Sequence, residues 1–188
     1  GQVCVSVNRF YIHDTIYESF VSQLATAVKA LKVGNGLDDG VVVGPLIEAS
    51  AVKKVREHVE DALAKGAEVL AGGEAHELGG NFWQPTVLGE CHEQMLLAQE
   101  ETFGPLAACF RFSDEDDVIH RANNTPYGLA AYFYTQNLSR VFRVSQALES
   151  GMIGINECAV STELGPFGGV KESGLGREGS VLGLEEYL

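Results

Sequence analysis

The sequence predicts an α/β fold with a largely parallel sheet flanked by helices. Stretches with the two-residue period of strands alternate along the 188 residues with stretches that have apolar residues at helical spacing. Hydrophobic residues make up 45% of the chain, which fits a folded globular protein with one sizeable core. We therefore expect a single domain that spans residues 1–188.

The first half of the chain predicts one strand and two helices before the central strands. Valines at Val3, Val5 and Val7 alternate with other residues, which predicts a strand that begins almost at residue 1. Thr15 and Glu18 have the spacing of a capping box at the start of a helix. The apolar face expected for that helix comprises Ile16, Phe20, Leu24, Val28 and Leu31. A second helix is expected to begin at Ser50, which would cap it. Its apolar face would comprise Val52, Val55, Val59 and Leu63.

The alternation of strands and helices continues to the end of the chain. Further strands are expected at residues 68–71, 83–88, 106–112, 129–135 and 152–156. Helices are expected at residues 114–122, with Ser113 as the cap, and at 138–148 and 181–187. The carboxylates from Asp114 to Asp117 are interpreted as a first helical turn, where the helix dipole favours negative charge, rather than as a calcium loop.

Charge and composition exclude several kinds of partner. The formal net charge of −13 argues against nucleic acid and against anionic membranes, because phosphate groups are bound by clustered Lys and Arg. No apolar run approaches the roughly 20 residues that span a bilayer, and the first residues lack the pattern of a signal peptide. A strand pattern at one end and a helix pattern at the other favour a piece cut from a longer chain.

The cysteines and histidines give no metal-binding pattern. The four cysteines form no CxxC pair and are too few for a disulfide scaffold, so we expect a reducing, cytoplasmic location. The histidines are scattered along the chain, and each is expected at the surface: His13, His58, His76, His92 and His120. No metal site is predicted.

Cys4 has two interpretations from the residues alone. A cysteine in a strand pattern is commonly a small buried hydrophobe. A nucleophilic cysteine needs a thiolate that is stabilised by backbone donors or positive charge, and strand geometry does not place the nearby Arg9 against Cys4. The residues therefore nominate Cys4 as a nucleophile without assigning it.

Four motifs, in this order, resemble the aldehyde dehydrogenase family. They are GQVC at 1–4, EETFGP at 100–105, NNTPYGLAA at 123–131 and PFGGVKESGLGRE at 166–178. The resemblance covers essentially the whole chain and implies an aldehyde dehydrogenase-like catalytic domain, as a C-terminal catalytic fragment that lacks most of the cofactor-binding half. It also implies that the Cys4 thiolate attacks the aldehyde, that hydride passes to NAD or NADP, and that the resulting thioester is hydrolysed.

The resemblance further implies the partners of Cys4. One oxyanion donor is the backbone N–H of Cys4, whereas the second donor, an asparagine, and the glutamate base belong to the absent half, so the fragment alone is expected to be inactive. Glu101 is expected to hold the nicotinamide ribose hydroxyls, and Phe103 to pack near the nicotinamide. From the residues alone, a solvated loop acid or a charge at a helix start is the favoured interpretation of Glu101. Ordinary core packing of Phe103 is compatible with a place near the nicotinamide.

Within the family, the resemblance is strongest to succinate-semialdehyde dehydrogenases. It is carried by residues 79–88, 129–156 and 166–180. It implies that the hydroxyl of Ser161, with Thr162 as the alternative, donates to the distal carboxylate of the substrate, and that Phe167 lines the substrate tunnel. A water-facing loop serine and an aromatic loop anchor are the alternatives for these two positions.

Several further expectations follow from the resemblance. Ser6 replaces the second cysteine with which some members form a redox switch, so that version of the switch is expected to be absent. Lys171 and Arg177 are expected to be structural ion-pair residues, and Glu178 has a structural and a proton-transfer interpretation. The full-length protein is expected to be a homo-oligomer, a dimer or a tetramer.

The alternatives concern the substrate and the class of protein. The first alternative is another aliphatic or ω-carboxy aldehyde as substrate. The second is a non-catalytic member, truncated or oligomer-forming. The residues that would distinguish NAD from NADP are expected upstream of Gly1.

Overall fold

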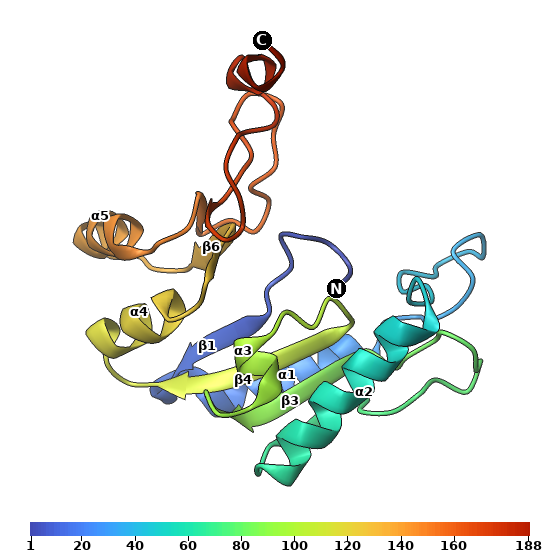
Figure 1. The fold of residues 1–188 in the computed structure, drawn as a ribbon. Coiled ribbons are helices and arrows are strands. Elements are labelled where there is room, and N and C mark those ends of the chain that lie inside the picture. Colours follow the sequence, from blue (N-terminus) through green and yellow to red (C-terminus); the bar gives the residue numbers. More distant parts are fainter. The chain divides into compact units, whose positions relative to one another are not determined.

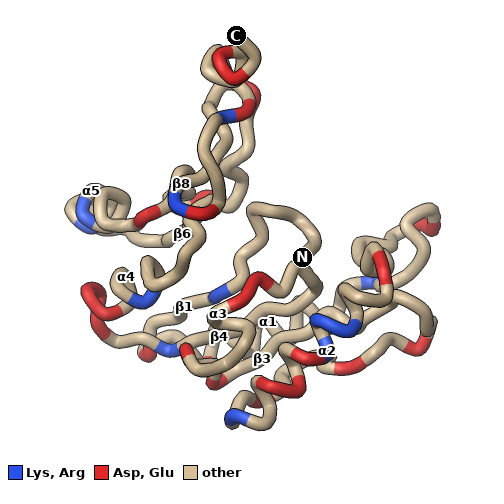
Figure 2. The backbone as a smooth tube through the Cα atoms, in the orientation of Figure 1, with Lys and Arg blue, Asp and Glu red and all other residues tan.

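The computed structural model describes residues 1–188 and consists of two compact units, Gly1–Ser113 and Asp114–Leu188. Each unit is described below by itself (Figure 1). A single catalytic domain over both units stays a prediction. Acidic residues outnumber basic ones by 26 to 13 and occur along both units (Figure 2).

The first unit is built on a four-stranded sheet with the order β1-β4-β3-β2. β1 (Arg9–His13), β4 (Leu106–Phe112) and β3 (Thr86–Cys91) run parallel to one another, and β2 (Glu68–Ala71) pairs antiparallel with β3 at the edge. The predicted α/β class with a largely parallel sheet is therefore confirmed.

Helices cover both faces of this sheet. On one face, α1 (Tyr17–Lys29) packs its buried residues against Val87 and Cys109. On the other face, α2 (Ala49–Ala64) and the short α3 (Leu96–Gln99) pack against Leu88 and Phe110. Adjacent strand residues point to opposite faces, so each central strand contributes to both cores.

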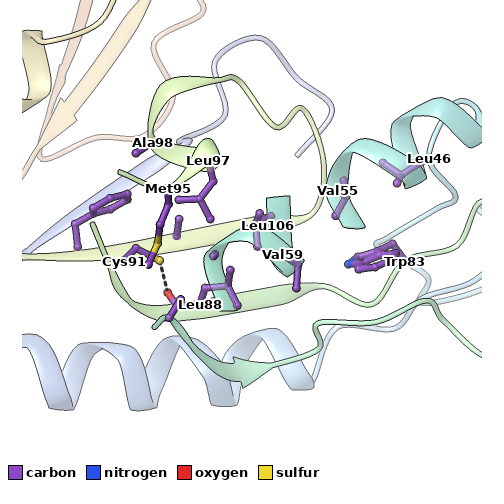
Figure 3. Packing of buried hydrophobic residues seen from close by; sticks show 14 residues of the cluster. Leu46, Val55, Val59, Trp83, Leu88, Cys91, Met95, Leu97, Ala98 and Leu106 are labelled. Carbon is purple, nitrogen blue, oxygen red and sulfur yellow. Dashed lines mark hydrogen bonds between the residues drawn. The ribbon is translucent and has the colours of Figure 1, made fainter. Parts of the chain in front are cut away.

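The core beneath α2 is the larger of the two clusters and is drawn in Figure 3. Val55 and Val59 of α2 point toward Leu88 and Leu106 of the sheet, and all four are at most 8% exposed. Trp83 closes one end of the cluster, and its indole N–H donates to Thr86 Oγ1 at 3.2 Å. This packing fixes α2 against β4, the strand that follows the 100–105 loop.

The second unit contains two small two-stranded sheets. β6 (Ala130–Phe133) pairs parallel with β7 (Met152–Ile155), and β5 (Tyr127–Gly128) pairs antiparallel with β8 (Val170–Lys171). Its other elements are α4 (Glu115–Asn123), α5 (Leu138–Ala147) and the 3-10 helix η2 (Leu182–Tyr187).

The predicted strand near residue 1 is wrong. Residues 1–8 form a turn and an irregular segment, in which the N–H of Ser6 donates to the carbonyl of Val3 at 2.9 Å. Pairing with β4 begins only at Arg9, which is opposite Ala108. The alternating valines thus belong to a turn, because a local hydrogen bond replaces the strand ladder there.

The predicted helix starts are also wrong in detail. His13, rather than Thr15, caps a 3-10 turn, η1 (Asp14–Ile16), that precedes α1. Helix α1 buries Tyr17, Val21 and Ala25, which lie one residue beyond the predicted apolar face. Helix α2 follows Glu48 and has no side-chain cap, so Ser50 does not play the predicted role.

Several other elements agree with the sequence. β4 has the predicted bounds, and α5 ends one residue earlier than predicted. The acidic cluster does form the first turn of α4, although Asp114 rather than Ser113 caps it by accepting from the N–H of Asp117 at 2.9 Å. None of the helices is both long and apolar enough to span a bilayer.

Candidate active site

A hollow of about 450 Å³ opens in the first unit between the N-terminal segment and the 100–105 loop. Gly1, Gln2 and Ser6 contribute to one wall, and Glu101 and Phe103 contribute to another. Figure 1 shows the N-terminus beside the loop that leads into β4. The structure thus brings two of the sequence motifs to one place.

Cys4 lies in the turn at the edge of this hollow and is exposed. Its neighbours Val3 and Ser6 line the hollow and close the turn through their backbone hydrogen bond. The interpretation of Cys4 as a small buried hydrophobe is wrong, because β1 begins beyond it. Its role as the nucleophile stays a prediction.

The start of the chain is in tight contact with the 100–105 loop. A Cβ atom built on Gly1 would lie 1.7 Å from the carbonyl oxygen of Gly104, so only glycine fits there. Gln2 adds a second anchor, because its Oε1 accepts from the N–H of Ile47 at 3.1 Å. These contacts fix the segment immediately before Cys4.

The loop itself presents Glu101 and Phe103 at the hollow. Both side chains are exposed, and Phe103 has a φ of 51°, in the left-handed region that non-glycine residues seldom adopt. Gly104 follows, where an added Cβ would meet Cγ2 of Val55 at 2.4 Å. The loop therefore passes so close to α2 that its backbone conformation is tightly constrained.

His58 of α2 contacts this loop from the protein interior and is only 1% exposed. Its Nδ1 shares a hydrogen bond with Oγ1 of Thr102 at 3.0 Å. Its Nε2 lies 3.6 Å from Oε2 of Glu100 and has no hydrogen-bond partner. Burial lowers the pKa of His58, and the positive charge of Lys54 adds to this effect.

The surface location predicted for His58 is therefore wrong. The helical period could have placed it correctly, because His58 follows Val55 by three residues and precedes Val59 on the same buried face. The scattered histidines have no metal-ligand spacing, and the surface location was inferred from that alone.

Ser161 and Phe167 belong to the second unit. Ser161 is exposed in a loop, and its role stays a prediction. Phe167 is partly buried and exchanges two backbone hydrogen bonds with Glu178, of 2.8 and 2.7 Å. Phe167 is thus held in place through its backbone, and Glu178 is exposed in this unit.

Lys171 and Arg177 have structural contacts in the second unit. Lys171 pairs with Glu149, as predicted, and its ammonium also donates to the carbonyl of Asn123 at 2.8 Å. The guanidinium of Arg177 instead donates to the carbonyls of Gly169 and Gly176, at 2.8 and 2.6 Å. No group of three or more His, Cys, Asp or Glu side chains in residues 1–188 is placed to hold a metal ion.

Comparison with known proteins identifies the class. All of residues 1–188 match the Aldehyde dehydrogenase family, and the chain belongs to that family. The chain is 58% identical over 188 residues to the NADP+ succinate-semialdehyde dehydrogenase of Escherichia coli (strain K12), and 57% identical to 3-sulfolactaldehyde dehydrogenase of Pseudomonas putida. Each match covers 100% of this chain and 39% of the relative.

Solved structures agree with this assignment. The fold superimposes on succinate-semialdehyde dehydrogenase from Burkholderia pseudomallei with a TM-score of 0.98 and 53% identity, covering 100% of this chain and 39% of that one. The aldehyde dehydrogenase-like fold and the resemblance to succinate-semialdehyde dehydrogenases are therefore confirmed. The chain spans about two fifths of the length of the relatives that it matches.

Proposed function

We propose that this chain is the nucleophile-bearing part of an NAD(P)+-dependent enzyme that oxidises a semialdehyde to the carboxylic acid, with succinate semialdehyde as the favoured substrate. The observation that carries the proposal is the meeting of the exposed Cys4 turn with the Glu101 loop at one hollow. The similarity to enzymes named for anionic aldehydes, succinate semialdehyde and 3-sulfolactaldehyde, supports the substrate class.

The proposed reaction begins at the sulfur of Cys4. The thiolate adds to the aldehyde carbon, and the resulting oxyanion accepts from the backbone N–H of Cys4. Loss of hydride from that carbon leaves a thioester on Cys4. Water then adds to the thioester and releases the acid, one proton and the free thiolate. The nicotinamide of NAD(P)+ supplies the hydride acceptor when it is bound.

The walls of the hollow fit the ribose-nicotinamide end of such a cofactor. Glu101 offers an exposed carboxylate that can accept from two ribose hydroxyls, and Phe103 offers a half-exposed ring, 39% accessible, for an apolar contact. We propose these roles for the two residues. These roles concern only the nicotinamide and its ribose, so they do not distinguish NAD from NADP.

For the substrate we propose Ser161 and Phe167 of the second unit. The exposed hydroxyl of Ser161 is free to donate one hydrogen bond to a carboxylate, and the ring of Phe167 supplies apolar surface. A panel of aldehydes that compares kcat/KM for succinate semialdehyde, its sulfonated analogues and neutral aldehydes of similar length separates the substrate alternatives. Preference for the neutral aldehydes would favour the aliphatic alternative.

Substitution of Cys4 in the full-length enzyme tests the proposal. Cys4→Ala should lower kcat by at least about a thousandfold, because the proposed thioester forms on the sulfur of Cys4. Cys158→Ala is the matched control, since Cys158 is also an exposed free cysteine and has no proposed role in the reaction. Near wild-type oxidation by Cys4→Ala would refute Cys4 as the nucleophile, whereas a wild-type protein that oxidises none of the aldehydes would favour the non-catalytic or oligomer-forming alternative.

A further inference from the structure

Asn8 connects the segment that bears Cys4 to the loop that bears Glu101. It lies between the Cys4 turn and β1, and its side chain is partly buried. Its Nδ2 donates to the carbonyls of Leu97 and Glu100, at 2.9 and 3.3 Å. Its Oδ1 accepts from the N–H of Thr102 at 3.0 Å. Two of these three partners are the immediate neighbours of Glu101.

The chemistry of these contacts requires an amide. A primary amide offers two N–H donors and one carbonyl acceptor, and Asn8 uses both kinds at once. An aspartate of the same shape could still accept from Thr102 but would place negative charge against the carbonyls of Leu97 and Glu100. An alanine would leave all three backbone groups without this partner.

The far side of the same loop is held by a second side chain. His58 shares a hydrogen bond with the hydroxyl of Thr102, while Asn8 accepts from the backbone N–H of Thr102. The peptides before and after Glu101 are therefore both fixed, one through the carbonyl of Glu100 and the other through Thr102. Glu101 projects from a short stretch of backbone whose position is set partly by the Cys4 segment.

We propose that Asn8 is a positioning residue that fixes the position of the Glu101 loop relative to the Cys4 turn, so that a nucleotide bound through Glu101 is presented to the Cys4 thiol. The inference rests on the proposed function of the hollow. It adds that binding of NAD(P)+ at Glu101 changes the reactivity of the Cys4 thiol, and that this effect depends on the hydrogen bonds of Asn8.

The test uses the full-length enzyme with Asn8→Asp and Asn8→Ala. Asn35→Ala is the matched control, because Asn35 is an exposed loop asparagine whose side chain accepts only from the nearby N–H of Leu37. Two quantities are measured: the KM for NAD(P)+ against kcat, and the rate of Cys4 alkylation by iodoacetamide with and without NAD(P)+. Thermal unfolding of each variant is recorded alongside.

Both Asn8 variants should raise the KM for NAD(P)+ by about tenfold, the effect of losing roughly 1.4 kcal/mol of interaction. The change in Cys4 alkylation rate that NAD(P)+ produces in the wild type should be lost in both variants and kept in Asn35→Ala. Asn8→Asp preserves the volume of the side chain, so it keeps the test decisive if Asn8→Ala does not fold.

The outcomes separate the inference from the proposed function. If the wild type responds to NAD(P)+ and Asn8→Asp responds equally, with an unchanged KM, Asn8 has only a structural role and the inference is overturned. If Cys4 alkylation in the wild type is indifferent to saturating NAD(P)+, the proposed function of the hollow fails, and the coupling fails with it.

Discussion

Gly104 shows how closely single residues are fitted around the hollow. Its Cα faces Val55, which is completely buried in the core beneath α2, and a Cβ at this position would come within 2.4 Å of that side chain. The preceding residue, Phe103, already has a left-handed backbone. The loop therefore has little freedom to move away from an added methyl group.

Replacement of this glycine tests the tight fit. Gly104→Ala should lower the free energy of unfolding by about 1–3 kcal/mol, because overpacking forces Val55 or the loop to shift. Gly36→Ala is the control, since Gly36 has no atom within 4 Å of its would-be Cβ and no positive φ. Urea unfolding of the two variants in the full-length protein gives the comparison, and equal midpoints would refute the tight fit.

Individual site residues differed in how well the sequence revealed them. Cys4 and Glu101 lie in motifs that a family resemblance makes conspicuous, and the structure places the segments that carry them at one hollow. Asn8 was not recognised, because its partners are backbone groups about 90 residues away, and no local pattern reports such contacts. Sequence reasoning about side chains alone has no access to backbone acceptors of this kind.

At the scale of elements, helix α2 carries a titratable group into the core. His58 lies on its buried face, and the pKa of the imidazole is lowered from its ordinary value of 6.5, first by burial and then by Lys54. The carboxylates of Glu100 and Asp61 oppose this shift but do not reverse it. The neutral form of His58 is therefore the one that the folded unit favours.

This lowered pKa predicts how stability depends on pH. Below about pH 6.5 the unfolded chain binds a proton at His58 more readily than the folded chain does, so His58 contributes stability above that pH and loses it as the pH falls. The melting temperature of the wild type should fall between pH 7.5 and 5.5, and His58→Gln should make this fall smaller. His120→Gln, at an exposed histidine, is the control. An identical slope in wild type and His58→Gln would contradict this account.

Elements with strong patterns were predicted well, and their ends were not. β4 and α5 match the sequence because a run of apolar residues and a clear helical period define them. The starts of β1, α1 and α2 were missed because turns and tertiary pairing, rather than capping residues, set them. The short α3 was not predicted, since four residues are too few to show a period.

At the scale of the whole molecule, the chain combines a family assignment with a length shorter than that of its relatives. It belongs to the aldehyde dehydrogenase family, yet spans about two fifths of the relatives' length. The two units were not predicted, because the alternation of strands and helices continues across the boundary at Ser113. The proposed chemistry therefore has to be tested in the full-length enzyme.

The most direct test of the proposed chemistry is to look for the covalent intermediate. The full-length enzyme is mixed with succinate semialdehyde and NAD(P)+, quenched in acid within its first turnovers, and its peptides are analysed by mass spectrometry. The account predicts a succinyl thioester on the peptide that contains Cys4, and none on the peptides that contain Cys158 or the buried Cys91 and Cys109. Turnover without any acylated Cys4, or an acyl group on another cysteine, would contradict it.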